Sequence, residues 1–443
     1  MIRQDSPLLT DLYELTMLQA YLAEGMLEPA VFELFVRKLP ARRNFLVAAG
    51  LETLIDWLEH LQFDAADLDA LAADGRFNDD LLDYLATFRF SGDVDAMPEG
   101  TVFFPDEPVV RITAPMPQAQ FIETRLINVI QFQTLIASKA ARCMLAADAR
   151  PLIDFGLRRA HGTQAGLYAA RAAYIAGFAG TSTVAAKSEY GIPVFGTMAH
   201  SYIQAHAHEA DAFAQFARSQ PHGLTLLIDT YDTQAAAHRV VALPPELRAG
   251  LRSVRIDSGD LGEQARRVRS ILDHGGLPHV RIFASGGIDE DVIAALVAGN
   301  APIDSYGVGT ALVTSSDAPN LDCAYKLQAY ANQPRRKRSQ GKATWPGAKQ
   351  VYRQHAASGV LERDVVTLVD EPAPGDALLV PAMRDGRRPG NSDSIDAVRA
   401  RCSRELATLP AALRRLTPAM TPFQADISAG VRELADRLDR DSH

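Results

Sequence analysis

The chain has 443 residues, of which 47% are hydrophobic and 22% charged, so it can build a large core and two structural units. Its formal net charge of −9 argues against nucleic acid as a partner, because phosphate contacts need a basic face. No apolar run approaches the roughly 18 residues that cross a bilayer, and no signal-peptide pattern opens the chain, so we expect a cytoplasmic protein without a membrane partner.

The first part of the chain predicts a mixed α/β segment. A helix is expected from Asp11 to Ala23, where leucines recur every three or four residues. The alternating run VFELFV follows as a strand, and several helical and extended pieces come after it. A cluster of prolines then indicates a boundary, so we assign residues 1–115 to an N-terminal α/β segment. One long helix over 118–142 is expected to lead into the next unit.

The middle of the chain has a different rhythm. Seven short apolar runs, from LIDF at 152–155 to DSYGVG at 304–309, alternate with helical segments, which predicts parallel strands joined by crossover helices. Seven strands favour a barrel-like α/β domain, which we assign to residues 116–350. In this architecture, ligands gather at the carboxyl ends of the strands. Residues 351–443 form an irregular C-terminal segment that ends in helix-like stretches.

Two successive strand ends carry small residues that suit a phosphate. Backbone N–H groups and the positive end of a following helix can approach an anion where no side chain intervenes. Glycine after a strand is more often ordinary turn chemistry, but two such turns at late barrel strands favour a monophosphate site. The residues are Ser285, Gly286 and Gly287 in the first turn, and Gly307, Gly309 and Thr310 in the second.

The segment VRIDSGDL lies upstream of these turns and supplies charged residues. Asp257 and Asp260 can accept hydrogen bonds from ribose hydroxyls or help to hold a magnesium ion, although Asp260 suits a helix N-cap equally well. Arg255 lies two residues before Asp257, so strand alternation points both side chains to the same face. An arginine that points into a barrel needs a carboxylate or phosphate partner.

The local sequence alone does not decide the roles of three further features. The pair Arg158 and Arg159 can meet a diphosphate or a carboxylate, or can form surface salt bridges. The basic run Arg335–Arg338 is either a solvated loop or a lip beside a phosphorylated ligand. His200, in the stretch GTMAHS between a strand-like and a helix-like segment, can be a core histidine, a metal ligand or a nucleophile.

Six motifs together resemble the nicotinate phosphoribosyltransferases, which are type II phosphoribosyltransferases. In chain order they are LLTDLYELTMLQAY, FGLRRA, GTMAHSY, VRIDSGDL, YGVGT and KATWPGAKQVYR, and they span most of residues 8–353. The resemblance implies a barrel domain plus an α/β domain in which 1–115 packs with 351–443. It also implies a homodimer whose active sites lie between subunits. Asp322 and Cys323 depart from the small residues that many members carry there.

The resemblance also implies roles for single residues. Tyr13 matches a tyrosine that stacks on nicotinate in the pocket of the neighbouring subunit. Thr197 and Arg255 match nicotinate contacts, with Arg255 as the carboxylate partner. Thr310 matches a contact to the phosphoribosyl phosphate. Two further residues fall in motifs that line the same pocket: Arg159 and Asp257.

His200 matches the histidine that the family phosphorylates with ATP. A neutral imidazole can attack a phosphoryl group, and Thr197 and Ser201 leave room and hydrogen bonds for the resulting phosphohistidine.

The implied reaction joins the ring nitrogen of nicotinate to C1 of 5-phosphoribosyl-1-diphosphate. It releases diphosphate and forms nicotinate mononucleotide, with Mg²⁺ as cofactor and ATP as co-substrate, and it is the first step of NAD salvage from nicotinate. The alternatives are a related transferase for nicotinamide or quinolinate, and a non-catalytic sensor that binds a phosphorylated sugar or nucleotide.

Overall fold

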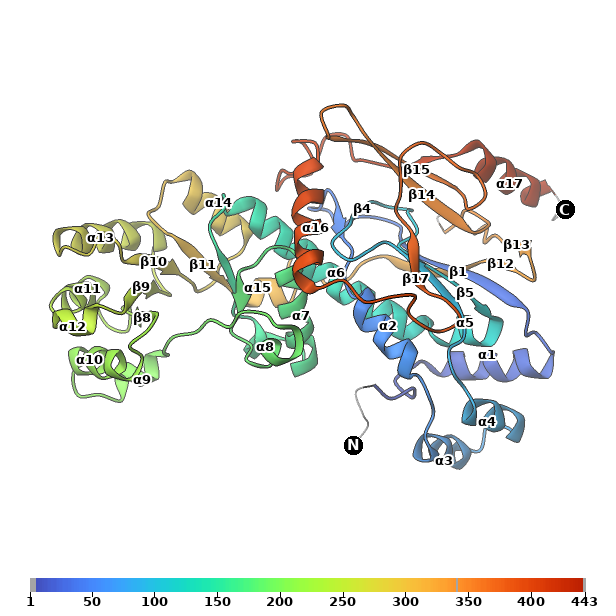
Figure 1. The fold of residues 1–443 in the computed structure, drawn as a ribbon, viewed down its shortest axis with the longest axis horizontal. Coiled ribbons are helices and arrows are strands. Elements are labelled where there is room, and N and C mark those ends of the chain that lie inside the picture. The colour runs from blue at the N-terminus through green and yellow to red at the C-terminus, as the bar shows by residue number, and fades with distance from the viewer. Residues whose placement is uncertain (1–4, 340–341, 441–443) are drawn as a thin grey trace. The chain divides into compact units, whose positions relative to one another are not determined.

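The computed structural model describes residues 5–339 and 342–440 (Figure 1). Its contacts divide the chain into two compact units. The first unit combines Met1–Leu135 with Asn320–His443, and the barrel unit is Ile136–Pro319.

The first unit is organised around a six-stranded sheet with the order β13-β12-β1-β5-β3-β17. Its central strand β1 (Pro29–Val36) pairs antiparallel with β5 (Val110–Pro115) on one side and with β12 (Cys323–Tyr330) on the other. The sequence pattern predicts that residues 320–350 belong to the barrel domain, but their strand β12 completes the sheet of the first unit. The other strands are β3 (Asp93–Ala96), β13 (Gln333–Pro334) and β17 (Val380–Met383).

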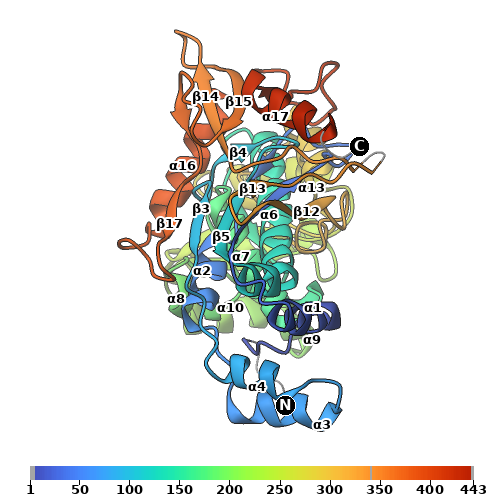
Figure 2. The same cartoon turned by 90° about the vertical axis from the view of Figure 1, so that its right-hand side faces the viewer.

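A smaller four-stranded sheet is built by the C-terminal segment, in the order β16-β14-β15-β18. Helix α17 (Ala429–Arg440) lies beside β14 and β15 in both views of the molecule (Figures 1 and 2). The strands are β14 (Lys349–His355), β15 (Leu361–Leu368), β16 (Asp376–Ala377) and β18 (Asp426–Ile427). The C-terminal segment also contains the helix α16 (Ile395–Thr408). In the N-terminal segment, β2 (Leu46–Val47) and β4 (Val102–Phe103) form a separate two-stranded sheet.

Buried ion pairs join segments of the first unit that are far apart in sequence. Lys349 Nζ of β14 lies 2.7 Å from Glu33 Oε2 of β1, and both side chains are almost fully buried. Arg353 contacts Asp364 and Glu405 at 2.6 Å each. A buried charge without its partner is strongly destabilising, so the Glu33–Lys349 pair holds the N-terminal segment to the C-terminal one. The two Arg353 pairs hold β14, β15 and α16 of the C-terminal segment together.

The helices of the N-terminal segment follow the sequence pattern. The helix expected over Asp11–Ala23 is α1 (Leu12–Ala23). The single helix expected over 118–142 is two helices, α5 (Met116–Phe121) and α6 (Glu123–Ala146), which meet at Ile122. The other helices are α2 (Leu51–His60), α3 (Ala65–Asp74) and α4 (Asp79–Ala86).

The barrel unit contains a six-stranded parallel sheet with the order β7-β6-β11-β10-β9-β8. Its first strand, β6, pairs with its last, β11, which is the closure expected of a barrel. The strands are β6 (Leu152–Asp154), β7 (Gly180–Thr181), β8 (Leu224–Leu227), β9 (Leu251–Ile256), β10 (Arg281–Ala284) and β11 (Ser305–Val308).

PVFG, the third of the seven apolar runs, is not one of the six strands but narrows the opening between β7 and β8. Val194 forms a parallel bridge with Thr181 of β7. Thr197 Oγ1 then donates a hydrogen bond to the backbone carbonyl of Thr225 in β8. The sheet is therefore curled into a partial barrel, and the prediction of an α/β fold with a barrel-like domain is confirmed.

Helices follow the strands of the barrel unit along the chain, as predicted from the alternating pattern. On β9, Val254 and Ile256 are fully buried, whereas Ser253 lines a cavity inside the curled sheet and Arg255, two residues later, lies on the same face of the strand. No helix in the described part of the chain is long and apolar enough to cross a membrane. The helices are α7 (Thr163–Ile175), α8 (Ala185–Tyr190), α9 (His200–Gln204), α10 (Glu209–Ser219), α11 (Thr233–Val241), α12 (Pro245–Arg248), α13 (Leu261–His274), α14 (Glu290–Ala298) and α15 (Thr310–Val313).

Glu14 is a fully buried carboxyl group on α1. Gln120 Nε2 of α5 donates to it at 3.1 Å, and Thr124 Oγ1 of α6 donates at 3.2 Å. Burial and the nearby Glu123 carboxylate raise the pKa of Glu14 to about 7, although both hydrogen bonds oppose the shift. The folded protein therefore keeps this proton at pH values where the unfolded chain has lost it.

We predict that this carboxyl group makes the protein less stable as the pH rises from about 4.5 to about 7. Unfolding releases its proton in that window, so the free energy of unfolding falls by on the order of 3 kcal/mol. Glu14→Gln removes this loss, and its melting temperature relative to wild type should be higher at pH 8 than at pH 5.

Glu24→Gln, at the exposed end of the same helix, is the control and should shift the melting temperature equally at both pH values. A Glu14→Gln variant with the same relative stability at pH 5 and pH 8 would contradict the prediction.

Candidate active site in the barrel unit

Three residues at the carboxyl ends of β9 and β10 form the centre of the site. Arg255 Nε donates to Ser285 Oγ at 2.7 Å, and Arg255 Nη2 lies 3.0 Å from Asp257 Oδ1. Ser285 Oγ donates to the same carboxylate oxygen at 2.6 Å. Because β9 and β10 are neighbouring parallel strands, their ends bring these side chains together. The structure thus unites three residues that the sequence singled out.

The environment of Asp257 favours its ionised form. Burial opposes ionisation, but the Ser285 hydrogen bond and the charge of Arg255 outweigh it and hold the pKa of Asp257 below its usual range. A carboxylate that stays charged at this edge can attract a cationic group or a metal ion.

Asp229, at the end of β8, belongs to the same cluster and was missed by the sequence analysis. Its Oδ2 accepts hydrogen bonds from the Asp257 backbone N–H at 2.8 Å and from Ser258 Oγ at 2.6 Å. Its other oxygen, Oδ1, is buried and has no hydrogen-bond partner among the described residues. The run LTLLID ends in an aspartate, as VRID does. This similarity in the sequence could have indicated Asp229 as a site residue.

His200 is the first residue of α9 and faces this cluster. Its Nδ1 lies 3.0 Å from Thr230 Oγ1, and its Nε2 lies 3.9 Å from Asp257 Oδ2. The imidazole is 39% exposed, so His200 is not a core histidine. Its two nitrogens reach groups at the ends of β8 and β9, which leaves it open to a ligand. Ser201 follows it and is exposed, whereas the hydroxyl of Thr197 is used in closing the sheet.

The two small-residue turns lie at the same edge, and packing explains part of their composition. Gly286 has a φ of +85°, and a Cβ there would lie 1.9 Å from the Asp257 carbonyl oxygen. Gly287 has a φ of +63° but open space around it. A Cβ at Gly307 would lie 2.8 Å from the Phe155 ring. Gly309 precedes the short helix α15, which begins at Thr310.

Phe155, directly after β6, is a second residue that the sequence analysis missed. The Arg255 guanidinium carbon lies 5.3 Å from the centre of its ring, within cation–π range. Phe155 also packs edge-on against Phe283, with ring centres 5.5 Å apart. An aromatic face therefore lies beside the central arginine. Phe155 is the first residue of the FGLRRA motif, which was the available signal.

Asp154 holds the loop that carries Phe155. It accepts hydrogen bonds from Thr181 Oγ1 at 2.7 Å and from the Gly156 N–H at 2.8 Å. Burial raises the pKa of Asp154 to about 6 against these two bonds.

Several predicted residues have less specific surroundings. Arg158 and Arg159 are exposed in the 3-10 turn η1 (Leu157–Arg159) after β6. Asp260 Oδ1 accepts from the Glu263 N–H at 2.9 Å, which is the N-cap contact of α13. Tyr13 lies on α1 of the first unit and is 43% exposed. None of these positions assigns a ligand by itself.

The two remaining sequence features lie in the first unit and have local partners. Arg336, in the basic run, contacts Asp439 of α17 at 2.6 Å. Asp322, one of the two departures, pairs with Arg37 at 3.1 Å.

Magnesium suits the oxygen atoms of the site but does not have a complete protein cage. Among the described residues, no group of three or more His, Cys, Asp or Glu side chains could hold a metal. Mg²⁺ commonly takes one or two carboxylates and completes its shell with water and substrate phosphates. Asp257 and the unpartnered Oδ1 of Asp229 fit that pattern. Asp260 already uses one oxygen as a helix cap.

Comparison with known proteins identifies the family. The model for the nicotinate phosphoribosyltransferase N-terminal domain matches residues 8–131, and the model for the nicotinate phosphoribosyltransferase family matches residues 151–350. The chain belongs to the nicotinate phosphoribosyltransferase family.

Individual members of the family are similar over most of the chain. The nicotinate phosphoribosyltransferase pncB2 of Mycobacterium tuberculosis is 50% identical over 412 residues, which cover 92% of this chain and 89% of the relative. That of Bacillus subtilis is 38% identical and covers 82% and 76%. The crystal structure of human nicotinic acid phosphoribosyltransferase superposes with a TM-score of 0.87 at 27% identity, covering 97% and 99%.

We predict that Gly286→Ala is far more disruptive than Gly287→Ala. Both substitutions place an alanine in the left-handed region, which costs about 1–2 kcal/mol. At Gly286 the new Cβ also collides with the Asp257 carbonyl, so the end of β9 must move. Thermal unfolding should show a clearly larger drop in melting temperature for Gly286→Ala, and equal drops would refute the role of this contact.

Proposed function

We propose that the chain transfers the phosphoribosyl group of 5-phosphoribosyl-1-diphosphate to the ring nitrogen of nicotinate. The products are nicotinate mononucleotide and diphosphate, as in the first step of NAD salvage from nicotinate. The single observation that carries this proposal is the cluster of Arg255, Asp257 and Ser285 beside the Phe155 ring at the carboxyl edge of the barrel. Family membership supports it.

Arg255 is the partner that we propose for the nicotinate carboxylate. Its Nε and Nη2 are bound to Ser285 and Asp257, which fixes the plane of the guanidinium. Its Nη1 has no hydrogen-bond partner among the described residues, so it is left for an incoming carboxylate. The adjacent Phe155 supplies a face for the pyridine ring.

The reaction needs positioning more than proton transfer. The lone pair of the pyridine nitrogen forms the new bond to C1, and the bond from C1 to the diphosphate oxygen breaks with its electron pair. Positive charge develops on the ribose as this bond breaks, and Asp257 is an ionised carboxylate close enough to the site to stabilise it.

The phosphate groups have separate places in the proposal. We assign the 5-phosphate to the backbone of the turns with Gly286, Gly287, Gly307 and Gly309, together with Thr310. Arg158 and Arg159 are exposed at the same edge and suit the diphosphate. Asp257 and Asp229 would hold Mg²⁺, which neutralises negative charge on the diphosphate when bound.

We further propose that ATP phosphorylates His200. If Nδ1–H donates to Thr230 Oγ1, the lone pair of Nε2 is free to attack the γ-phosphorus, and ADP leaves with the electrons of the broken bond. Ser201 offers a hydroxyl beside the new phosphoryl group. Because His200 also faces Asp257, a phosphate there would act on the substrate site directly.

A homodimer with shared active sites is part of the proposal. Leu12 and Tyr13 are 50% and 43% exposed at the start of α1, and Val184 and Tyr231 are 77% and 63% exposed in the barrel unit. Large apolar side chains that a single chain leaves in water favour contact with a second copy. Such a contact lets Tyr13 reach the pocket of a partner subunit.

The direct test is diphosphate release from phosphoribosyl diphosphate with nicotinate, nicotinamide or quinolinate, each with and without ATP. We expect release with nicotinate, faster when ATP is present. Diphosphate release with nicotinamide alone, or with quinolinate alone, would instead support the related transferase for that substrate. Binding of phosphoribosyl diphosphate without release under any condition would support a sensor.

We predict that Arg255→Gln raises the KM for nicotinate at least tenfold. The substitution should also reduce the preference of the enzyme for nicotinate over nicotinamide. The loss of a charge-assisted hydrogen bond is worth about 1.5–3 kcal/mol, which is about tenfold or more. Steady-state assays of diphosphate release measure the kinetics with each of the two substrates. Arg267→Gln, an exposed arginine of α13 with one salt bridge, is the control and should behave as wild type. An unchanged KM for nicotinate would rule out this role of Arg255.

For His200, incubation with γ-labelled ATP should give an acid-labile phosphoenzyme. His200→Asn should not become labelled and should lose the stimulation by ATP while keeping basal transfer. His208→Asn is a matched control, since His208 is exposed at the N-cap of α10 and asparagine is a good N-cap. Equal labelling of His200→Asn and wild type would reject the assignment.

A further inference from the structure

Lys139 is a lysine of α6 whose side chain is buried inside the barrel unit, with only 2% of it exposed. Its Nζ lies 2.6 Å from Glu290 Oε2 and 3.1 Å from Asp317 Oδ1. Arg142, about one turn further along α6, contacts the other oxygen of Glu290 through Nε at 3.0 Å. The cluster therefore joins two basic and two acidic side chains, each of which is at most 4% exposed.

The two acids of this cluster follow different strands of the barrel. Glu290 is the first residue of α14, so it comes just after the turn with Gly287 at the end of β10. Asp317 comes after the short helix α15, which begins at Thr310 behind β11. One ammonium group therefore ties the segment after β10 to the segment after β11.

These two segments carry the turns that we assign to the 5-phosphate of phosphoribosyl diphosphate. The ladder between β10 and β11 ends with the pair Ala284 and Tyr306, before both turns. Strand pairing therefore does not set the separation of the turns themselves. A single phosphate needs that separation to be correct, because the N–H groups of both turns must reach its oxygen atoms at hydrogen-bond distance.

Hydrogen bonds stiffen the path from the cluster to each turn. On the β10 side, Asp289 caps α14 by accepting from two backbone N–H groups of its first turn, at 3.0 and 2.9 Å. On the β11 side, the backbone N–H and the hydroxyl of Thr314 donate to the Thr310 carbonyl at 3.1 and 2.7 Å. A shift of Glu290 or Asp317 is therefore transmitted to the turns.

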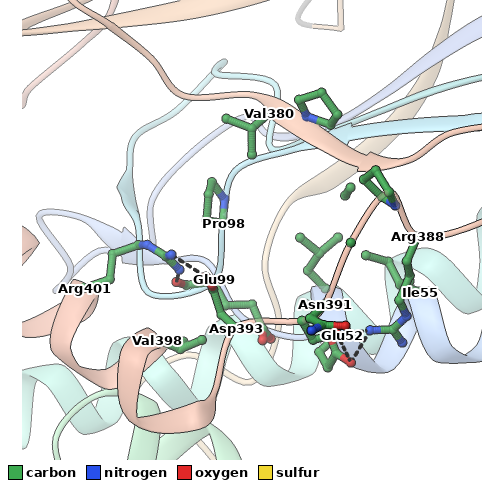
Figure 3. A pocket seen from close by; sticks show the side chains of 16 residues that line it. Glu52, Ile55, Pro98, Glu99, Val380, Arg388, Asn391, Asp393, Val398 and Arg401 are labelled. Atoms are coloured by element: carbon green, nitrogen blue, oxygen red, sulfur yellow. Dashed lines mark hydrogen bonds and ion pairs between the residues drawn. The ribbon is translucent and has the colours of Figure 1, made fainter.

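Ion pairs around a pocket of the first unit show a contrast. This pocket has a volume of about 340 Å³ and is lined by Arg388 and Arg401 (Figure 3). Arg388 contacts Glu52, whose side chain is 38% exposed, and Arg401 contacts Asp393, whose side chain is 50% exposed. Water can replace a lost partner in such exposed pairs, so each of them is worth little.

The acids around Lys139 are in the opposite situation. Glu290 and Asp317 are buried, so without the lysine each loses a charged partner in a place that solvent does not reach. A buried charge that loses its partner is strongly destabilised, and the chain responds by moving the acid or the segment that carries it.

We propose that Lys139 is a positioning residue of the phosphate site, which holds the turn after β10 and the turn after β11 at the separation that one monophosphate requires. It is not a phosphate ligand, because its ammonium group is buried and bound to two carboxylates. The inference rests on the proposed function, which places the 5-phosphate at these turns.

Two variants separate positioning from stability. Lys139→Met keeps the approximate length of the side chain but removes its charge, and it should lower the melting temperature. The double variant Lys139→Met with Asp317→Asn removes one charge of each sign. Replacing a buried ion pair by uncharged groups is often neutral for stability, so its melting temperature should return towards that of the wild type. The link between the two turns is broken in both variants.

Steady-state assays of diphosphate release then measure each substrate in the double variant. We expect the KM for phosphoribosyl diphosphate to rise about tenfold or more, since a displacement of about 1 Å can cost on the order of a hundredfold in activity. The KM for nicotinate should be unchanged. Ribose 5-phosphate, as a probe of the monophosphate site alone, should bind more weakly in titration calorimetry. Asp393→Asn, at an exposed pair of the first unit, is the control and should behave as wild type in every assay.

The proposal is overturned if the double variant keeps the wild-type KM for phosphoribosyl diphosphate and the wild-type affinity for ribose 5-phosphate. A parallel rise in the KM for both substrates would also overturn it, because that result indicates a general loss of structure. The same holds if ribose 5-phosphate does not bind to the wild type. Absence of diphosphate release in the wild type, with ribose 5-phosphate binding that depends on Lys139, would refute the transferase proposal alone.

Discussion

The carboxylate of Asp257 is the group on which the geometry of the barrel edge depends. It accepts from Arg255 and Ser285, its backbone N–H donates to Asp229, and one oxygen lies 3.9 Å from His200. An arginine inside a barrel is costly without such a partner, and the carboxylate is costly without the arginine. Each of the two charges therefore stabilises the other. Together with their hydrogen bonds, they fix the relative positions of the ends of β8, β9 and β10.

Buried ion pairs also occur in the first unit, but there they do not form a binding site. Glu33 with Lys349 and Arg353 with Asp364 are pairs in which every charge is closed off from water by its partner and by packing. The first pair joins the N- and C-terminal segments and the second joins β14 to β15, and neither leaves an atom for a ligand. At the barrel edge, by contrast, Arg255 Nη1, Asp229 Oδ1 and the half-exposed His200 keep capacity for binding. Incomplete pairing is what distinguishes a binding site from a structural ion pair here.

Phe155 lies in the interior of the curled barrel sheet. Its ring contacts the Arg255 guanidinium and also lines a cavity of about 550 Å³ inside the sheet, together with Thr197 and Phe283. Gly307 allows the ring to lie there, because a Cβ at that position would meet it at 2.8 Å. A small residue that looks like part of a phosphate turn in the sequence therefore has a packing function as well. Both roles are compatible, since the backbone N–H groups of the turn remain at the carboxyl edge.

The sequence by itself determined the alternation of strands and helices, the barrel-like fold and the family, because periodicity and ordered motifs are local properties of the chain. It also placed Arg255 and Asp257 on one face, since that follows from strand alternation alone. It did not reveal the roles of Asp229 and Phe155. Their significance depends on which strands become neighbours and on which charges find partners, and only tertiary packing decides that. For the same reason, only the structure showed that β12 completes the sheet of the first unit, because the partner of a strand can lie hundreds of residues away in the chain.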